Sequence, residues 1–286
     1  MASARDFQRQ INTVKNQARV FSALQTVSSV KFRKAEARVR RARPYAENVE
    51  EMMRDVAANA TGDLPLLTGR EVRRVAVCTL TADRGLAGGF NAQVLRRTVR
   101  LREEKDPGAL QVASGRKAVA FFRFRRVELA EVFTGFTDNP TYEKAREIGR
   151  TLTRLFDDED ADEVYLVYNR FESVLNQRPV VKRLLPVARE EDDEEEGNTS
   201  YMDYVPDAET VLKRLVPRYV ETMVWQALLE GAAGEHGARM TAMKNATDNA
   251  NDLVSDLTLQ MNKARQAQIT QEILEIVGGA EALSAG

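Results

Sequence analysis

The sequence of 286 residues has few of the side chains that build catalytic or metal centres, with one histidine and one cysteine. The single cysteine, Cys78, excludes an internal disulfide and favours a reducing compartment. It lies in the apolar run RRVAVCTL, which indicates a buried structural thiol rather than a nucleophile. The single histidine, His236, excludes a histidine pair for a metal. Beside Glu235, it is interpreted as a surface or local hydrogen-bonding group.

Other signatures of enzymes and membrane proteins are also missing. The sequence has no Gly-x-Ser-x-Gly elbow. Since it also has no histidine pair, we predict no catalytic residue, cofactor or metal site. No stretch approaches the roughly 18 apolar residues that span a bilayer, and the N-terminus has no apolar signal core. We therefore expect a soluble, intracellular chain. The 42 Lys and Arg nearly balance the 43 Asp and Glu, so a bulk basic surface for nucleic acid is not indicated.

The charges are nevertheless distributed unevenly. Residues 1–43 hold eleven Lys or Arg and two acids, and KFRKAEARVRRAR at 31–43 holds seven of the cations. These cations lie on several sides of a helix, which favours a solvated or partner-facing surface over nucleic acid. Residues 190–196 are seven consecutive acids. Such a block repels itself and is typical of a solvated loop, with a regulatory contact as the alternative.

The first 59 residues lack glycine and contain one proline, Pro44. Apolar or small residues recur at alternating steps of three and four, as in a heptad seam on one helix face. They are Ile11, Val14, Ala18, Phe21, Ser28, Phe32, Ala35, Val39 and Ala42. Gln25 occupies the one position of the series between Phe21 and Ser28. We predict a long helix that Pro44 kinks or restarts.

Residues 71 to about 187 show a different pattern, in which short apolar strands alternate with helical stretches. Strands are predicted at 73–80, 109–113, 126–133, 163–169 and 179–187, and helices at about 89–104, 115–124 and 141–156. This alternation indicates an α/β domain with a mostly parallel sheet. The strand at 179–187 is expected at an edge, because it is flanked by prolines.

A second long helix is predicted from about Asp207, interrupted early by Pro217 and ended by VGGA at 277–280. Its expected seam is Met243, Ala246, Ala250, Leu253, Leu257, Ala264, Ala267 and Leu274. Three glycines in GAAGEHG, 231–237, predict a bend or close packing.

The two terminal helices need partners along their length. A helix of about 55 residues is about 80 Å long, whereas an α/β domain of about 120 residues is about 30–35 Å across. The simplest partner for each helix is the other one. The sequence therefore predicts an antiparallel coiled coil (residues 1–60 and 207–286), an α/β domain (70–190) and an acidic loop (190–206).

The segment DRGLAGGFN, 83–91, follows the first predicted strand and opens a helix, where an α/β sheet would hold a nucleotide. It lacks a phosphate-binding Gly-Lys-Ser/Thr ending, and the spacing of Gly85, Gly88 and Gly89 misses the dinucleotide pattern. Tight backbone turns capped by Asp83 are the better interpretation.

The chain resembles the gamma subunit family of F-type ATP synthase. The strongest match is ARMTAMKNATDNANDLVSDLTLQMNKARQAQITQEILEIVGGAEAL, 238–283. The turn Asp83, Arg84, Gly85, Gly88 and Gly89 matches a second signature, and VYNRF a weaker third. The resemblance implies a Rossmann-like α/β domain between two coiled-coil helices. It also implies a rotor shaft without an active site of its own.

The family implies partners and a location. These partners are the ring of alpha and beta subunits, the epsilon and delta subunits, and the membrane c-ring that conducts ions. Rotation of the shaft then couples ion flow to ATP synthesis, or ATP hydrolysis to proton pumping. The expected place is the cytoplasmic face of the bacterial cell membrane, as a peripheral protein, with no cofactor and no nucleic acid.

The family also assigns residues. Arg265, Gln266 and Thr270 match positions that hydrogen-bond the beta subunits. Leu24 replaces a methionine that is common on the N-terminal helix, and the tip residues Leu274, Ile276 and Val277 match an apolar bearing. Two rival interpretations are a nucleotide-binding α/β enzyme with helical dimerisation arms and a coiled-coil scaffold that binds nucleic acid through residues 31–43.

Overall fold

The structure, a computed structural model, describes residues 3–59, 67, 69–174, 176–187 and 208–284. It divides into two compact units, Met1–Val27 with Met240–Gly286, and Ser28–Arg239. The helices α1 (Ala4–Asn59) and α6 (Ala208–Ser284) contribute to both units. The acidic run 190–196, its loop to 206 and the cap at Asp207 lie outside the described residues. The predicted domain boundaries stay a prediction.

The second unit contains a five-stranded sheet of order β3-β2-β1-β4-β5. Its strands are β1 (Val75–Leu80), β2 (Leu110–Ser114), β3 (Leu129–Phe133), β4 (Glu163–Phe171) and β5 (Gln177–Leu185). All neighbouring pairs are parallel except β4 and β5. The predicted parallel sheet, all five strands and the edge position of the last one are confirmed.

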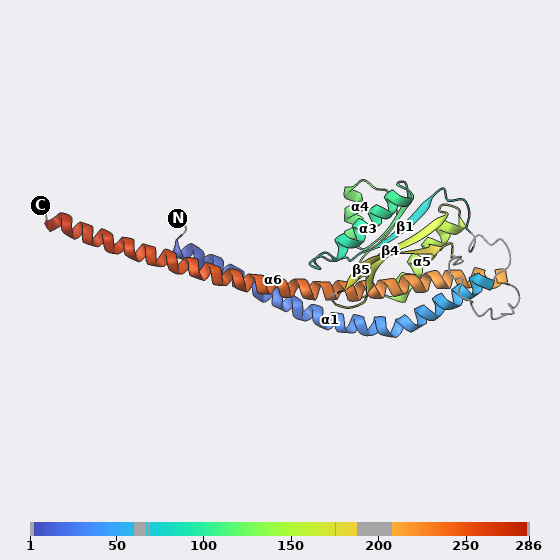
Figure 1. Cartoon of the computed structure of the whole chain (residues 1–286), viewed down its shortest axis with the longest axis horizontal. Coiled ribbons are helices and arrows are strands. Elements are labelled where there is room, and N and C mark those ends of the chain that lie inside the picture. The colour runs from blue at the N-terminus through green and yellow to red at the C-terminus, as the bar shows by residue number, and fades with distance from the viewer. Residues whose placement is uncertain (1–2, 60–66, 68, 175, 188–207, 285–286) are drawn as a thin grey trace. The chain divides into compact units, whose positions relative to one another are not determined.

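Helices cover both faces of the sheet (Figure 1). The helices α3 (Phe90–Lys105) and α4 (Arg116–Phe124) lie on one face, and α5 (Tyr142–Asp157) packs on the other with the long helices. Successive side chains of β1 lie on opposite faces of the sheet. Val75 and Val77 pack with α3, whereas Ala76 and Cys78 pack on the face covered by α5 and α6. Cys78 is fully buried, and burial raises the pKa of its thiol to about 12. The structural interpretation of this cysteine is confirmed.

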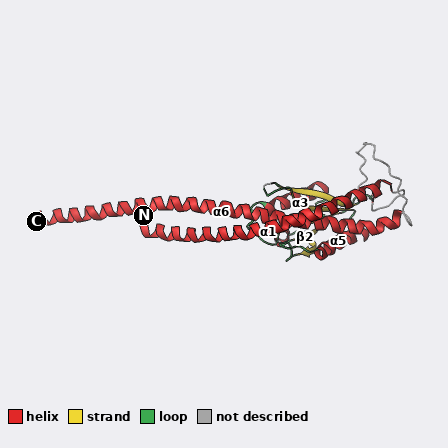
Figure 2. Ribbon diagram, turned by 90° about the horizontal axis from the view of Figure 1, so that it is seen from below, coloured by secondary structure: helices red, strands yellow, loops and turns green. Residues whose placement is uncertain are grey.

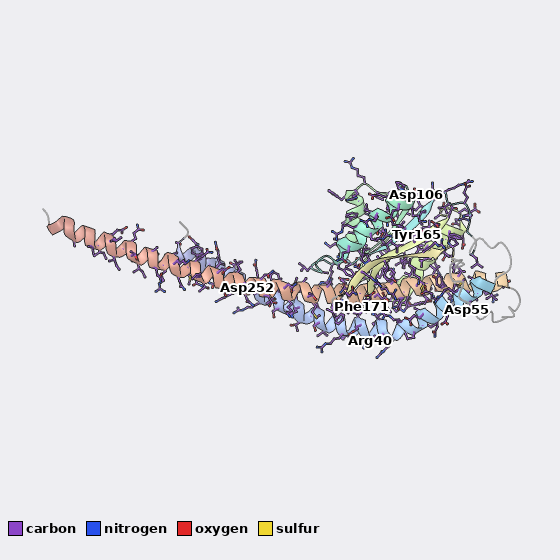
Figure 3. The ribbon with its side chains drawn as sticks, in the orientation of Figure 1. Arg40, Asp55, Asp106, Tyr165, Phe171 and Asp252 are labelled. Atoms are coloured by element: carbon purple, nitrogen blue, oxygen red, sulfur yellow. The ribbon has the colours of Figure 1, made fainter. Side chains whose placement is uncertain are left out.

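The long helices pack against the sheet by close approach. An added methyl group at Gly234 would lie 2.9 Å from the Phe90 ring, and one at Gly237 would lie 3.4 Å from Gln177. Close packing is therefore confirmed at these two glycines, but Gly231 faces open space. Phe171, at the end of β4, lies against the long helices (Figure 3), with its ring centroid 5.8 Å from that of Phe32.

The interruption predicted at Pro217 and the helix end predicted at 277–280 were wrong, and the helix does not restart at Pro44; the kink predicted there stays a prediction. The helix α1 continues through Pro44, and α6 continues through Pro217 and past the glycines at 278–279 to Ser284. A proline removes one backbone hydrogen bond, and a glycine costs about 1 kcal/mol. Tertiary burial outweighs such costs near the prolines: Ala46 and Val49 follow Pro44 in the core, and Val216 precedes Pro217 there.

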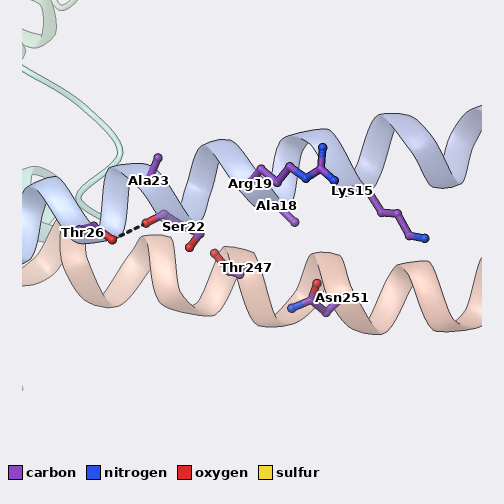
Figure 4. Close-up of a pocket in the computed structure, with 8 residues that line it drawn as sticks. All are labelled: Lys15, Ala18, Arg19, Ser22, Ala23, Thr26, Thr247 and Asn251. Atoms are coloured by element: carbon purple, nitrogen blue, oxygen red, sulfur yellow. Dashed lines mark hydrogen bonds between the residues drawn. The ribbon is translucent and has the colours of Figure 1, made fainter.

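In the first unit, α1 and α6 run side by side in opposite directions (Figures 2 and 4). In Figure 4 the α1 residues from Thr26 to Lys15 follow the same direction as Thr247 to Asn251 on α6. The predicted seam of α1 is confirmed, since all its residues are buried or half-buried.

The seam of α6 differs from the prediction. From Met243 on, its buried and half-buried positions include five predicted ones, Met243, Ala246, Ala250, Leu257 and Ala264, and four others, Thr247, Val254, Thr258 and Met261. Leu253, which we had assigned to the seam, is 47% exposed. The reason is that a row beginning at Thr247 repeats every seven residues and reaches Val254. Ala267 and Leu274 are also exposed, because α6 continues beyond the N-terminus of α1 (Figure 2).

Candidate functional site

The turn after β1 is organised by the Asp83 carboxylate. Oδ1 accepts from the Arg116 N–H at 3.1 Å, and Oδ2 accepts from the N–H groups of Gly135 (2.9 Å) and Thr137 (3.1 Å) and from the Thr137 hydroxyl. Partial burial would raise the pKa of Asp83, but these hydrogen bonds outweigh it and lower the pKa. At the start of α4 the carboxylate thus takes the Arg116 N–H, while the N–H groups of Lys117 and Ala118 bond the Ala82 carbonyl and the Thr81 hydroxyl. These three donors at the helix N-terminus, which could otherwise bind an anion, already have partners. The donors to Asp83 belong to the segments after β2 and β3, so the predicted capping of the 83–91 turns by Asp83 stays a prediction.

The rest of the signature turn connects the sheet to α6. Gly88 has a positive φ of 53°, a conformation that costs glycine little. Gly89 directly precedes α3, and Arg84 is exposed. The Gly85 carbonyl accepts from Arg239 Nε on α6 at 3.2 Å. The two segments with the strongest family resemblance, 83–91 and 238–283, are thus joined by a direct hydrogen bond.

Arg239 belongs to a polar cluster in which His236 and Glu235 are buried and Asp138 and Lys31 are half-buried. His236 is 1% exposed, so the surface interpretation of this residue was wrong, although it does make a local hydrogen bond. Its Nε2 lies 3.2 Å from the Asp138 carbonyl, and its Nδ1 lies 3.3 Å from Arg239 Nη1. Because a guanidinium only donates, Nδ1 accepts and Nε2–H donates, which describes a neutral imidazole.

Charges surround this histidine on every side. The Glu235 carboxylate accepts a hydrogen bond from Arg239, and Lys31 Nζ lies 2.5 Å from Asp138 Oδ2. Burial lowers the pKa of His236 and raises the pKa of Glu235. Sequence reasoning missed this cluster. The spacing of Glu235 and Arg239, four residues apart on a helix, is the signal that could have indicated one of its pairs.

The three residues matched to beta-subunit contacts lie on the exposed part of α6 in the first unit. Arg265, Gln266 and Thr270 are all exposed. The Thr270 hydroxyl donates to the Gln266 carbonyl at 3.0 Å within the helix. The polar heads of Arg265 and Gln266 have no hydrogen-bond partner among the described residues. Arg265 and Gln266 are therefore available to a surrounding partner.

The remaining predicted contacts lie on the same unit. The tip residues are large and apolar yet exposed: Leu274 is 66% exposed, Ile276 72% and Val277 53%. Leu24 is half-buried on α1. Exposed apolar side chains in a group indicate an interaction surface.

A shallow groove lies between α1 and α6 in the coiled coil of the first unit (Figure 4). Its walls are small, polar or cationic: Lys15, Ala18, Arg19, Ser22, Ala23, Thr26, Thr247 and Asn251. Thr26 uses its hydroxyl to bond the Ser22 carbonyl at 3.0 Å. The lining holds hydroxyl groups but no carboxylate or imidazole that could act on them as a general base.

The described ranges contain neither a cluster of metal-binding side chains nor a membrane-spanning helix. Within them, no group of three or more His, Cys, Asp or Glu side chains is placed to hold a metal ion. In the same part of the chain, no helix is long and apolar enough to cross a bilayer.

The family model described as ATP synthase matches residues 3–283. The ATP synthase gamma chain of Rubrobacter xylanophilus is 70% identical over 290 residues and covers 100% of both chains. The ATP synthase gamma chain of Moorella thermoacetica is 48% identical, covering 99% of this chain and 100% of its own. The chain belongs to the ATP synthase gamma chain family.

Solved structures share the fold. One similar chain comes from the mitochondrial ATP synthase of Euglena gracilis in rotational state 3. The TM-score is 0.69 and the sequence identity is 19%, and the match covers 99% of this chain and 95% of the Euglena gracilis chain. A second comes from the central stalk and c-ring structure of Tetrahymena thermophila, with a TM-score of 0.60 and 20% identity over 79% and 99% of the two chains. The predicted combination of an α/β domain with long terminal helices is confirmed.

Family membership decides between the functional hypotheses. It confirms that this gamma chain is a central-stalk rotor subunit of ATP synthase and a non-catalytic member of the complex. The rival interpretations, a nucleotide-binding enzyme and a nucleic-acid scaffold, receive no support from the geometry. The N–H groups of Arg116 and Gly135, next to the turn after β1, already donate to the Asp83 carboxylate.

Proposed function

We propose that the exposed end of α6 transmits rotor angle to the catalytic beta subunits through Arg265, Gln266 and Thr270. The observation that supports this proposal is that α6 continues past the N-terminus of α1 (Figure 2). Beyond Ala264 every residue whose side chain is described is exposed. Polar groups there are hydrated in the isolated chain and free to bond an enclosing partner. Leu274, Ile276 and Val277 turn in an apolar sleeve, and Leu24 contributes a contact from α1.

The proposed partners follow from the family. They are the alpha and beta subunits of the catalytic ring, the epsilon and delta subunits, and the membrane c-ring; nucleic acid is not among them. The similar structures from Tetrahymena thermophila and Euglena gracilis are of assemblies with F1, a central stalk and a c-ring. We place the chain at the cytoplasmic face of a bacterial cell membrane, held there by protein partners.

In the proposed mechanism, the contacts between the rotor and a beta subunit differ in strength between the conformations of that subunit. A rotor angle can shift a beta subunit between conformations only if it interacts more favourably with one of them. A tenfold change in nucleotide affinity corresponds to about 1.4 kcal/mol, and one hydrogen bond to a charged group contributes about 1.5–3 kcal/mol. A few positions such as Arg265 are therefore sufficient to bias one step. Synthesis needs a larger total, which is spread along the coiled coil.

Arg265→Ala tests this role in the assembled complex. We expect weaker ATP-driven proton pumping in inverted membrane vesicles, with nucleotide binding by the complex retained, because only the directional contact is lost. Lys263→Ala is the matched control. It removes one exposed cation two residues away, about 200° around the helix, and should leave pumping unchanged. Normal pumping by Arg265→Ala would refute the proposed role.

A further inference from the structure

The two long helices are held in different ways within the second unit. Every residue of α6 from 219 to 239 is buried or half-buried, so neighbours enclose this part of the helix on all sides. The helix α1 packs on one side only, and residues such as Arg33 and Arg41 on its other side are exposed. Apolar packing is not directional, whereas hydrogen bonds have defined distances and angles. The rotational setting of α1 therefore depends on the polar bonds beside its seam.

One side of the α1 seam is bonded to the segment between β3 and α5. Lys31 Nζ lies 2.5 Å from Asp138 Oδ2. Seven residues later, Arg38 donates from Nη1 to Asn139 Oδ1 and from Nη2 to the Pro140 carbonyl, both at 2.6 Å. Two bonds from one planar guanidinium fix its direction as well as its position. We call these contacts the first edge.

The other side of the seam is bonded to the sheet and to α6. Arg43 Nη2 donates to the Phe171 carbonyl at the end of β4 at 2.9 Å and lies 3.5 Å from Glu230 Oε1 on α6. The Phe171 N–H donates to the second oxygen of the same carboxylate at 3.1 Å. Seven residues after Arg43, Glu50 accepts a hydrogen bond from Lys182 Nζ on β5 at 2.6 Å. We call these contacts the second edge.

The two edges flank the apolar seam of α1. Arg38 and Arg43 are five residues apart, which places them about 140° apart around an α-helix. The seam residues Val39 and Ala42 lie between these two directions, at about 100° and 40° from Arg38. Bonds on one edge alone would act as a hinge, whereas bonds on both edges oppose rotation of the helix in either direction.

The bonds at the two edges differ from ordinary surface ion pairs, which contribute little to stability. Glu230 is 4% exposed, and the acceptors at Phe171 and Pro140 are main-chain carbonyls. The bonded residues of α1 are seven apart on each edge, as expected for positions that flank a heptad seam. By contrast, Arg33 and Arg41 are exposed and make no bond within the described ranges.

A rotor subunit must pass torque between its sheet domain and its long helices. We propose that Arg38 and Arg43 are positioning residues that, with the other bonds of their two edges, lock α1 to the sheet against rotation about its own axis. Both long helices, rather than α6 alone, then transmit the torque. This proposal concerns the rotor role that family membership shows, and it does not depend on the contacts proposed for Arg265.

The angular fluctuation of the assembled rotor tests the proposal. The chain is assembled with the alpha and beta subunits of the catalytic ring, and the ring is fixed to a glass surface. A bead is attached through Glu103→Cys, an exposed position on α3. The variance of the bead angle in the resting complex is inversely proportional to the torsional stiffness between ring and bead. Two helices of equal geometry carry about equal shares of a twist, so releasing α1 should raise the variance up to about twofold.

Two variants open the two edges separately. Arg43→Gln/Glu50→Gln removes the second edge without changing the net charge, and Arg38→Gln removes the forked bond of the first edge. Each should raise the variance, because the remaining edge acts as a hinge. The matched control is Arg41→Gln/Glu47→Gln, which makes the same chemical change on the same helix. Both control positions are exposed and make no bond within the described ranges, so the variance should stay at the wild-type value.

A purely structural role is distinguished by the same measurement. Labelling of one thiol per chain verifies that the sheet is folded in each variant, since Cys78 is fully buried. If the edge bonds serve stability alone, their loss lowers the urea midpoint of the isolated chain and leaves the angular variance unchanged, which would overturn the proposal. A rise in the variance for only one of the two edges, or an equal rise in the control, would overturn it as well.

Discussion

Arg239 on α6 donates from Nε to the main-chain carbonyl of Gly85 at 3.2 Å, across 154 residues of sequence. The same guanidinium bonds the buried Glu235 carboxylate and the His236 ring. One side chain therefore holds the turn after β1 and the long C-terminal helix together.

Replacing Arg239 should destabilise the second unit strongly. Arg239→Ala removes the bond to Gly85 and leaves Glu235, which is 1% exposed, without its cation. Removing one partner of a buried ion pair costs about 3–5 kcal/mol. The free energy of unfolding, measured in urea, should fall by that order. Arg41→Ala, at an exposed position, should change it by less than about 0.5 kcal/mol.

The double variant Arg239→Ala/Glu235→Gln separates lost charge pairing from lost packing. Neutralising the carboxylate should recover part of the stability, because an amide is less costly to bury than an unpaired charge. No recovery would show that the charge of Glu235 is not the source of the loss.

Stability should decrease below about pH 6.5 because of His236. Its pKa is lowered by burial in the folded chain, so the unfolded chain takes up the proton first. The contribution is complete above the unfolded pKa of about 6.5 and is lost as pH falls through the folded pKa. Glu235 acts in the opposite direction, since its raised pKa favours the folded chain at low pH.

His236→Gln isolates the histidine contribution. His236 is the chain's only histidine, and Asp138, Lys31, Arg239 and Glu235 keep their charges in the variant. Urea titrations at pH 7.5 and pH 5.5 should show a larger loss on acidification for the wild type. Equal losses in both proteins would contradict the assigned role.

Gly115 should tolerate no side chain. It has a φ of 92°, and an added methyl group would lie 2.1 Å from the Thr81 carbonyl oxygen. Gly115→Ala should therefore lower the free energy of unfolding by about 3 kcal/mol or more. Gly231→Ala is the contrasting change, because Gly231 lies within α6 and faces open space. It should raise stability by about 0.5–1 kcal/mol.

The register of the coiled coil can be tested at two adjacent residues. Val254→Ser should weaken the seam by about 1 kcal/mol, because Val254 is half-buried between the helices. Leu253→Ser should have little effect, since Leu253 is 47% exposed. Hydrogen exchange of residues 243–261 measures both changes. Faster exchange in Leu253→Ser alone would restore the seam first predicted from the sequence.

Much of the fold follows from local pattern. The strand β1 is a short apolar run, and VAVCTL predicts a buried strand because it has no charged face to expose. The seam of α1 follows from steps of three and four, which place Ile11 and Ala18 on one face. The two terminal helices are expected to pack against each other, because neither can bury its apolar seam alone. The family resemblance rests on the same local information.

Several features depend on contacts distant in sequence. Pro44 and Pro217 do not end their helices, because core packing around them outweighs a lost hydrogen bond. His236 is buried because Asp138 and Lys31 come to it from other elements, and no periodicity along α6 shows that. The choice of Val254 over Leu253 depends on the direction from which α1 approaches.

The sequence by itself determined the elements, their order, the family and the polar residues near the end of α6, because all of these depend on neighbours within a few turns of helix or strand. Only the tertiary structure decided that Asp83 accepts from the Arg116 N–H at the start of α4 and that Arg239 joins α6 to Gly85. Those contacts form between atoms far apart along the chain, and their energies exist only once the sheet has brought the elements together.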